Sequence, residues 1–323
     1  MSFQSLNYPS NTFSHVNTHK TLYKPKLNPV LALPPPSVIL HTDDSSSTFM
    51  LGQANAVGII GGISANSTLN FLKKLVQWSS ENGKDSIPFV LCSDPELNKD
   101  LLSHERHYFP SLGRQKEHSK FDDSQIVKSL KSKRVFLERS GARCIVMPCH
   151  VSHSWHDEVS KDCSVHFLHM GDCVAKELKE AKLKPLEAGS PLRIGVLATN
   201  ATLTAGFYQE KLQNEGFEVV LPDKATMEHT IVPAIEALDR KDMEGARNLL
   251  RIALQVLLVR AVNTVILASD NMRDLLPQDD PLLKKCIDPM DALVRSTIEW
   301  ARAAEKGQGN HVKMQNVVQD MSL

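Results

Sequence analysis

Between about residues 55 and 305, short apolar runs alternate with longer segments whose apolar residues repeat at helical spacing. Six of the runs are nearly continuous in apolar residues and end in a small or polar residue; they span 57–62, 87–93, 144–149, 193–199, 218–223 and 264–269. Such runs are typical of parallel strands that are buried on both faces. The alternation predicts an α/β fold in which helices cover parallel sheets.

Three of the intervening segments, 67–82, 124–140 and 243–260, carry apolar residues on one helical face. In the second of them Leu130 and Leu137 lie on this face, and Gly141 is suited to end the helix. We therefore expect a helix in each of the three segments.

The order of the apolar runs repeats within the chain. The runs 57–62 and 144–149 of the first half correspond to 193–199 and 264–269 of the second half, and this alignment places Cys149 opposite Ser269. The repeat predicts two pseudo-symmetric lobes, each a parallel sheet flanked by helices, with the active site in the cleft between them. Loops at the carboxyl ends of the strands should line that cleft.

These patterns divide the chain into four parts. We expect the first lobe over residues 55–168, completed by a returning helix over 285–305, and the second lobe over 169–284. The polar, glycine-containing segment 306–323 is expected to be a flexible tail.

The first 54 residues differ in composition from the lobes. No acidic side chain precedes Asp43, whereas Lys20, Lys24 and Lys26 lie among many Pro, Ser, Asn and Thr residues. A segment without a periodic apolar face is expected to be disordered. Its composition resembles that of a transit peptide, which predicts a plastid location in preference to a mitochondrial one. Without such targeting we expect a cytoplasmic protein.

The overall composition disfavours several classes of partner. The chain has 37 Lys+Arg and 37 Asp+Glu, a formal net charge of +0, and no basic patch, so we expect no nucleic-acid partner. Polar residues interrupt the longest apolar stretch, 254–268, so we expect no membrane span. The six cysteines form no CxxC pair and are interpreted as reduced thiols.

The segment 147–169 is the richest in reactive side chains. Cys149 ends a predicted strand where a helix is expected to begin, and the positive end of a helix lowers the pKa of a thiol from about 8.5. Three interpretations are open: a reactive thiolate assisted by His150 and His153, a metal site in which His153 and His156 join Cys149, and a small buried cysteine beside surface histidines. No second cluster with zinc-ligand spacing supports the metal site.

The glycine-rich turn after the first strand does not match a dinucleotide-binding fingerprint. Counting from Gly61, that fingerprint needs Gly at 63 and Gly or Ala at 66, where this chain has Ile63 and Asn66. The turn is either a capped strand-to-helix connection or, with the Ser64 hydroxyl, a binding site for a carboxylate.

Taken in order, the motifs VGIIGG, LCSDP, VMPCHVSH, FLHMGD, GVLAT and VILASD resemble those of the aspartate/glutamate racemase superfamily over residues 56–300. The resemblance implies an enzyme without PLP, metal or other cofactor, in which one cysteine from each lobe moves the Cα proton of an amino acid. It also implies a homodimer that acts on a small carboxylate such as aspartate or glutamate.

The resemblance assigns the first catalytic cysteine to Cys149, and His153 matches a family histidine in the same segment. Ser269 stands where the family has its second cysteine, and Asp270 beside it is a candidate replacement for the missing acid/base. A serine hydroxyl does not ionise near neutral pH without a strong neighbouring base. The symmetric two-thiol mechanism is therefore not expected in its usual form.

Without PLP, the site must stabilise an enediolate-like carboxylate through hydrogen-bond donors. The residues expected to bind substrate are Ser64, His150, His153, Thr199, Asn200, Thr202 and His229, with Lys224 as the alternative to His229.

The sequence thus predicts a racemase-like or epimerase-like isomerase with Cys149 as acid/base. Two alternatives remain open at this point. One is a one-thiol enzyme on the same scaffold, such as a decarboxylase, a lyase or a one-base isomerase. The other is a non-catalytic descendant that binds a carboxylate.

Overall fold

The computed structural model describes residues 53–81, 85–109, 122–185, 188–269 and 272–320, with side chains described as far as residue 307. All of them belong to one unit of the chain, Thr48–Leu323. The expected leader, except for its last two residues, and Asp270 lie outside the described residues. None of the described helices combines the length and apolar composition that a membrane span needs.

The first sheet has four parallel strands in the order β2-β1-β3-β4. They are β1 (Val57–Ile60), β2 (Phe89–Cys92), β3 (Cys144–Val146) and β4 (His166–Phe167). In the register of the sheet, Val57 pairs with Phe89 on one side and with Cys144 on the other.

The second sheet repeats this arrangement in the order β6-β5-β7-β8. Its strands are β5 (Arg193–Ala198), β6 (Glu218–Val220), β7 (Thr264–Ala268) and β8 (Cys286–Ile287). The two sheets confirm the predicted α/β fold with two lobes, and each of the six predicted strands is present.

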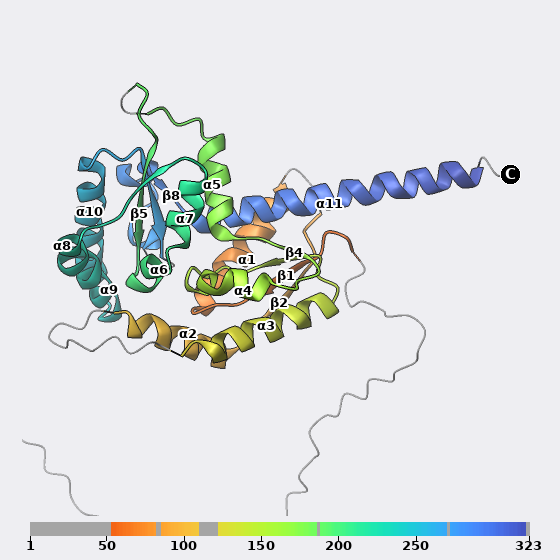
Figure 1. Ribbon diagram of the computed structural model, residues 1–323, viewed down its shortest axis with the longest axis horizontal. Helices are drawn as coiled ribbons and strands as arrows, with labels where there is room; N and C mark the ends of the chain where they lie inside the picture. Colours follow the sequence, from red (N-terminus) through yellow and green to blue (C-terminus); the bar gives the residue numbers. More distant parts are fainter. Residues whose placement is uncertain (1–52, 82–84, 110–121, 186–187, 270–271, 321–323) are drawn as a thin grey trace, which may run out of the picture. The chain divides into compact units, whose positions relative to one another are not determined.

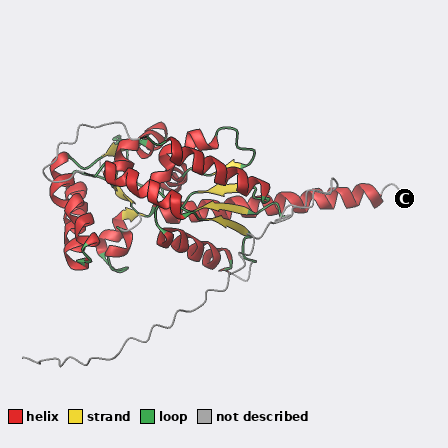
Figure 2. Cartoon of the chain, turned by 90° about the horizontal axis from the view of Figure 1, so that it is seen from below, coloured by secondary structure: helices red, strands yellow, loops and turns green. Residues whose placement is uncertain are grey.

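Helices cover both faces of the sheets (Figures 1 and 2). In the first half they are α1 (Ala65–Ser79), α2 (Pro95–His107), α3 (Ser124–Arg139), α4 (His156–Ser160) and α5 (Met170–Glu180). In the second half they are α6 (Asn200–Ala205), α7 (Phe207–Asn214), α8 (Lys224–Thr226), α9 (Val232–Asp239), α10 (Met243–Val259) and α11 (Pro289–Asp320). The three predicted helices correspond to α1, α3 and α10.

Polar caps start helices shortly after the strands. The Ser64 hydroxyl accepts a hydrogen bond from the Asn66 amide at the start of α1, and the Asp94 carboxylate accepts one from the Glu96 amide at the start of α2. Such caps satisfy backbone donors that the first helical turn leaves without partners. They fix the chain reversals at the carboxyl ends of β1 and β2.

Three apolar clusters hold these layers together. The largest joins the inner faces of both sheets, where Val57 and Ile59 of β1 share a core with Val196 of β5 and with buried residues of α5 and α11. A second cluster lies under α2 and α3, and a third under α9 and α10. The two lobes therefore share one core and each has a further core of its own.

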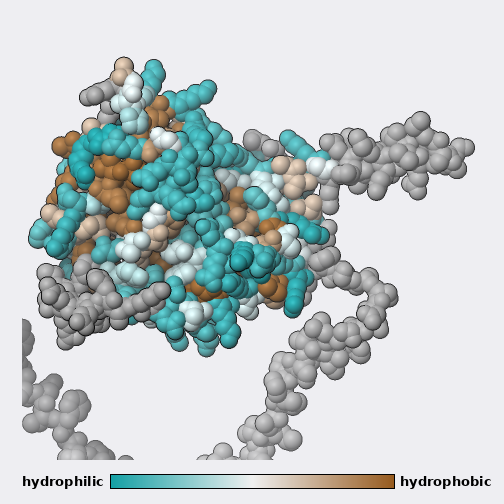
Figure 3. All heavy atoms as spheres, in the orientation of Figure 1, coloured by the Kyte–Doolittle hydropathy of each residue, from teal (hydrophilic) through white to brown (hydrophobic). Residues whose placement is uncertain are grey.

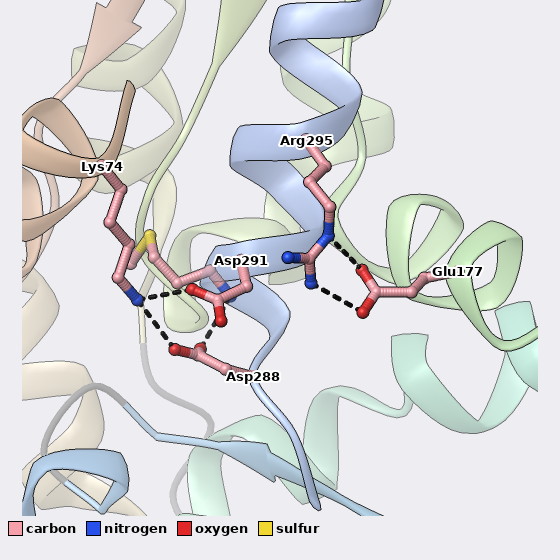
Figure 4. Close-up of polar contacts among 6 residues, drawn as sticks. Lys74, Glu177, Asp288, Asp291 and Arg295 are labelled. Atoms are coloured by element: carbon pink, nitrogen blue, oxygen red, sulfur yellow. Dashed lines mark hydrogen bonds and ion pairs between the residues drawn. The ribbon is translucent and has the colours of Figure 1, made fainter. Parts of the chain in front are cut away.

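Helix α11 carries the chain back from the second sheet to the first lobe, where it packs against α1 and α5. The Lys74 ammonium of α1 donates to Asp288 Oδ2 (3.0 Å) and Asp291 Oδ1 (2.6 Å), and the Arg295 guanidinium pairs with the Glu177 carboxylate of α5 (Figure 4). These ion pairs fix the start of α11 between the two helices.

Residues 306–320, part of the expected flexible tail, continue α11 as far as Asp320. Ala, Glu, Lys, Gln and Met are good helix formers, and each interior glycine costs only about 1 kcal/mol, so polar composition alone does not end the helix. Strand β2 is not buried on both faces, because it is an edge strand in which Phe89 and Leu91 are each 36% exposed.

The surface shows where apolar residues remain uncovered. In the view of Figure 3, hydrophobic residues gather on the second lobe in the region of β5 and α10, whereas hydrophilic residues predominate elsewhere on this face. On α10, Met243, Ile252 and Val259 are exposed.

Candidate functional site

A cavity of about 400 Å³ lies between the two lobes at the carboxyl ends of their strands. Ile63 and Ser64 follow β1, His150 follows β3, Thr199 follows β5 and Ser269 follows β7, and all five residues line it. The loops after these four strands therefore meet at one site, as the parallel topology predicts. A hollow of about 440 Å³ between α5 and α11 contains none of these residues.

Two helices complete the walls of the cavity. Helix α2 contributes Leu102, Glu105 and Arg106, and the end of α9 contributes Leu238 and Asp239. The sequence analysis singled out none of these residues. The loop after β2 was expected to line the cleft, but α2, which follows this loop, lines it instead.

Cys149 lies immediately behind this wall. It is fully buried, and its Sγ accepts a hydrogen bond from the Ile63 amide (3.4 Å). Cys149 is not among the residues that line the cavity, whereas Ile63 and His150 are. A short 3₁₀ helix, Val151–Trp155, follows in place of the expected α-helix. The amide of the β1 turn is thus one polar partner of this thiol.

Gly62 allows the turn after β1 to approach Cys149. A Cβ on Gly62 would lie 2.5 Å from the cysteine Sγ and closer still to its Cβ. Real Cβ atoms do not make contacts this short, so residue 62 has to be glycine while Cys149 keeps its place. Gly62 of the Gly61-Gly62 pair therefore serves this close approach.

His150 connects the lobes at the wall of the cavity. Its Nδ1 lies 3.0 Å from the hydroxyl of Tyr208 on α7, and both side chains are buried. Burial lowers the pKa of His150 to about 4, although the Asp288 charge opposes the shift. The ring is therefore neutral at pH 7, and its predicted role has to be that of a neutral hydrogen-bonding group.

His153 is not at the cavity. It is buried in a cluster with His156 and His169, whose ring centroids lie 4.6–5.9 Å apart, and its Nε2 lies 3.0 Å from the Met147 carbonyl oxygen. Burial, followed by the neighbouring histidines, lowers the pKa of His153 well below its ordinary value. Within the described ranges no group of three or more His, Cys, Asp or Glu side chains is arranged to hold a metal ion.

The second lobe brings some of its predicted residues to the cavity. Thr199 and Thr202 line it with their hydroxyls 3.4 Å apart. Asn200 does not line it, because its side-chain amide donates to the Tyr108 carbonyl oxygen (3.2 Å). His229 is exposed on the π-helix Met227–Ile231 and lies outside the cavity.

The placement of His229 at the cleft is therefore corrected, and its alternative Lys224, also exposed, does not line the cavity either. The apolar face of the segment turns Met227 and Ile231 into the core under α9 and α10, which leaves His229 on the solvent side.

The cavity offers hydrogen-bond donors for an anion. Four hydroxyl-bearing residues, Ser64, Thr199, Thr202 and Ser269, line it together with Arg106. Hydroxyl and guanidinium groups that converge on one space stabilise a carboxylate and the additional negative charge that it gains when a neighbouring carbon loses a proton.

Solved structures with the same fold include two racemase-related proteins. An aspartate racemase homologue from Pyrococcus horikoshii OT3 is 23% identical, with a TM-score of 0.60, and the match covers 77% of this chain and 99% of that one. The aspartate racemase of Picrophilus torridus is 26% identical, with a TM-score of 0.56, and the match covers 76% of this chain and 94% of that one.

Sequence comparison points in the same direction. The broad-specificity amino-acid racemase RacX of Bacillus subtilis is 24% identical over 174 residues, which are 52% of this chain and 64% of that enzyme. Residues 60–297 match the family described as Asp/Glu/hydantoin racemase. This chain belongs to the Asp/Glu/hydantoin racemase family.

Proposed function

We propose that the protein is a cofactor-independent isomerase that moves the Cα proton of an amino acid, with Cys149 as the acid/base. The observation that carries this proposal is the place of Cys149. Its thiol lies at the carboxyl end of β3, directly behind the two residues, Ile63 and His150, that form one wall of the interlobe cavity. Family membership supports the same class of reaction.

In the proposed reaction the Cys149 thiolate takes the Cα proton, and the electron pair of the broken C–H bond moves into the substrate carboxylate. The hydroxyls of Ser64, Thr199 and Thr202 stabilise the enediolate-like charge that develops there. Return of a proton to the opposite face gives the other enantiomer. The Ile63 amide, which donates to Sγ, remains able to donate to the thiolate.

This chemistry makes two demands on the site. Sγ has to turn from the β1 turn towards the cavity when substrate binds, because Cys149 is fully buried in this structure. The proton on the other face has to come from a group other than a second thiol, since Ser269 stands at the end of β7. Ser269 lines the cavity and is the proposed donor on that side, directly or through a bound water.

Complete burial of Cys149 favours a second candidate, a protein that binds a carboxylate in the same cavity without turning it over. A one-thiol enzyme is intermediate between the two, because it exchanges the Cα proton without completing racemisation. These three candidate functions predict different outcomes when the protein is incubated with a single enantiomer.

Chiral chromatography after incubation with one enantiomer at a time tests the proposal. We expect the wild type to form the opposite enantiomer of at least one amino acid and Cys149→Ala to form none. Cys144→Ala is the matched control, because Cys144 is equally buried but faces the shared core. Racemisation by Cys149→Ala at the wild-type rate would refute the role of this thiol, and absence of racemisation by the wild type would favour the other two readings.

We also propose a homodimer, which the family resemblance supports. Sedimentation velocity measures the mass of the particle in solution, and a monomer at micromolar concentration would contradict this part of the proposal.

A further inference from the structure

The part of the cavity formed by α2 and α9 combines apolar side chains with the charged Glu105, Arg106 and Asp239. Leu102 of α2 and Ile235 and Leu238 of α9 line it, together with Phe109, which follows α2. The hydroxyls that suit a carboxylate come instead from the opposite side, after β1, β5 and β7. A ligand whose carboxylate lies among these hydroxyls therefore directs its side chain towards α2 and α9, where apolar side chains lie beside the charged ones.

The charged residues of the cavity fit a zwitterion better than a dicarboxylic acid. Among the described lining residues, Arg106 is the single cation, whereas Glu105 and Asp239 are both acidic. His150 adds no positive charge at neutral pH, because burial holds its ring in the neutral form. A side-chain carboxylate directed towards α2 and α9 meets the acidic Glu105 and Asp239 as well as Arg106, whereas an uncharged side chain meets the apolar residues beside them.

The cavity is also large for a short substrate. Its volume of about 400 Å³ corresponds to about thirteen water molecules at roughly 30 Å³ each, which is more than an aspartate molecule fills. An aliphatic or aromatic side chain would occupy the remaining space and cover the leucine and isoleucine side chains there.

From these three features we infer that the protein binds amino acids with a bulky, uncharged apolar side chain, such as leucine or phenylalanine, in preference to aspartate and glutamate. The inference rests on the proposed function for the orientation of the substrate, with its carboxylate among the hydroxyls. It makes Leu102, Ile235 and Leu238 the residues that determine specificity.

Isothermal titration of the Cys149→Ala variant measures this preference without turnover. Leucine, phenylalanine, aspartate and glutamate are titrated as separate L and D enantiomers. We expect leucine or phenylalanine to bind at least tenfold more tightly than aspartate or glutamate. Tighter binding of aspartate or glutamate, or binding of none of the four, would overturn the inference.

Two substitutions in the same background localise the effect. Leu238→Ala is expected to weaken leucine binding roughly tenfold, because it removes apolar contact area. Leu102→Arg adds a cation at a position that is 38% exposed, so the fold tolerates it, and we expect it to raise glutamate affinity and lower leucine affinity. Ile252→Ala is the matched control, since Ile252 is a 46% exposed apolar residue of α10 outside the cavity.

The prediction about binding and the prediction about catalysis can fail independently of each other in these experiments. If leucine binds tightly to the variant but the wild type converts no amino acid, the proposed function is wrong and the specificity of the cavity stands. If the wild type racemises aspartate or glutamate and leucine does not bind, the proposed function stands and the inference is wrong. Unchanged affinities in both Leu238→Ala and Leu102→Arg would show that these walls do not contact the ligand, which also overturns the inference.

Discussion

The turn after β1 approaches the Cys149 thiol closely because residue 62 is glycine and has no Cβ. We predict that Gly62→Ala destabilises the protein by about 1–3 kcal/mol, because an added methyl group in a packed site forces its neighbours to move. The neighbour here is Cys149, so catalysis should fall together with stability. Urea unfolding and the racemisation rate measure the two effects.

Gly61→Ala is the matched control for this prediction. A Cβ at Gly61 would meet its nearest neighbour, the Ser93 hydroxyl, at 3.3 Å, which a small adjustment accommodates. We expect a smaller loss of stability and retention of the Cys149 environment. Equal effects of the two substitutions would contradict the special role of Gly62.

The buried histidines make stability depend on pH. Burial lowers the pKa of His169 to about 3, with the His156 and Lys211 charges acting in the same direction. In the unfolded chain this group titrates near its ordinary value of 6.5, so the unfolded state binds protons first as the pH falls. The stability contributed by the neutral ring is therefore complete above pH 6.5 and is lost progressively towards pH 3.

We predict that His169→Asn reduces this acid sensitivity. The asparagine oxygen can still accept the hydrogen bond that Gly171 N donates to His169 Nδ1 (2.9 Å), but it does not titrate. Between pH 7.5 and 5.5 the variant should lose about 1.4 kcal/mol less unfolding free energy than the wild type, as urea titrations measure. His229→Gln, at an exposed position, is the matched control for replacing a histidine. The same pH dependence in His169→Asn as in the wild type would contradict this account.

Among the structural elements, α11 has the clearest stabilising role, since it connects the second sheet to α1 and α5. Lys74 is half-buried between Asp288 and Asp291, and these carboxylates raise its pKa although burial acts to lower it. We predict that Lys74→Met lowers the unfolding free energy by about 1.5–3 kcal/mol, the range for hydrogen bonds to charged groups. Chemical denaturation at neutral pH is the appropriate measurement.

Lys131→Met is the control for α11. The Lys131 ammonium pairs with Glu158 Oε1 at 2.9 Å, but both side chains are largely exposed, and exposed pairs contribute less than about 1 kcal/mol. A loss in Lys74→Met no larger than in Lys131→Met would show that the ion pairs do not hold α11.

The elements that the sequence predicts are those with long periodic patterns. Strands such as β5 and β7 and helices such as α1 and α10 bury several consecutive or periodic apolar residues, which a sequence displays directly. Strands β4 and β8 have two residues each, too few for any periodicity. Their place at the edge of each sheet is set by pairing with β3 and β7.

The candidate site was predictable at the strand ends and not elsewhere. Ser64, Thr199 and Ser269 directly follow strands, and parallel topology brings such positions together. Arg106 and Asp239 reach the cavity because of how α2 and α9 pack, which local sequence does not encode. His153 packs against His156 and His169 in the buried cluster. Tertiary packing sets this orientation, and the spacing between His153 and Cys149 in the sequence does not reveal it.

At the scale of the whole molecule, the N-terminal segment, which has no acidic residue before Asp43, differs in composition from the two lobes. We propose that residues 1–54 direct the protein to plastids, on the ground of composition alone. A fluorescent protein fused behind residues 1–54 should accumulate in chloroplasts of plant cells, whereas a fusion to residues 55–323 should remain outside them. Diffuse cytosolic fluorescence of the first fusion would contradict the proposal.

The central claim for the whole molecule is that a single thiol at an interlobe cavity exchanges the Cα proton of an amino acid. Proton NMR in D₂O tests it most directly, as the loss of the Cα proton signal of the amino acid that binds most tightly. The account predicts exchange with the wild type and with Cys144→Ala, and no exchange above background with Cys149→Ala. Exchange by Cys149→Ala at the wild-type rate would contradict it.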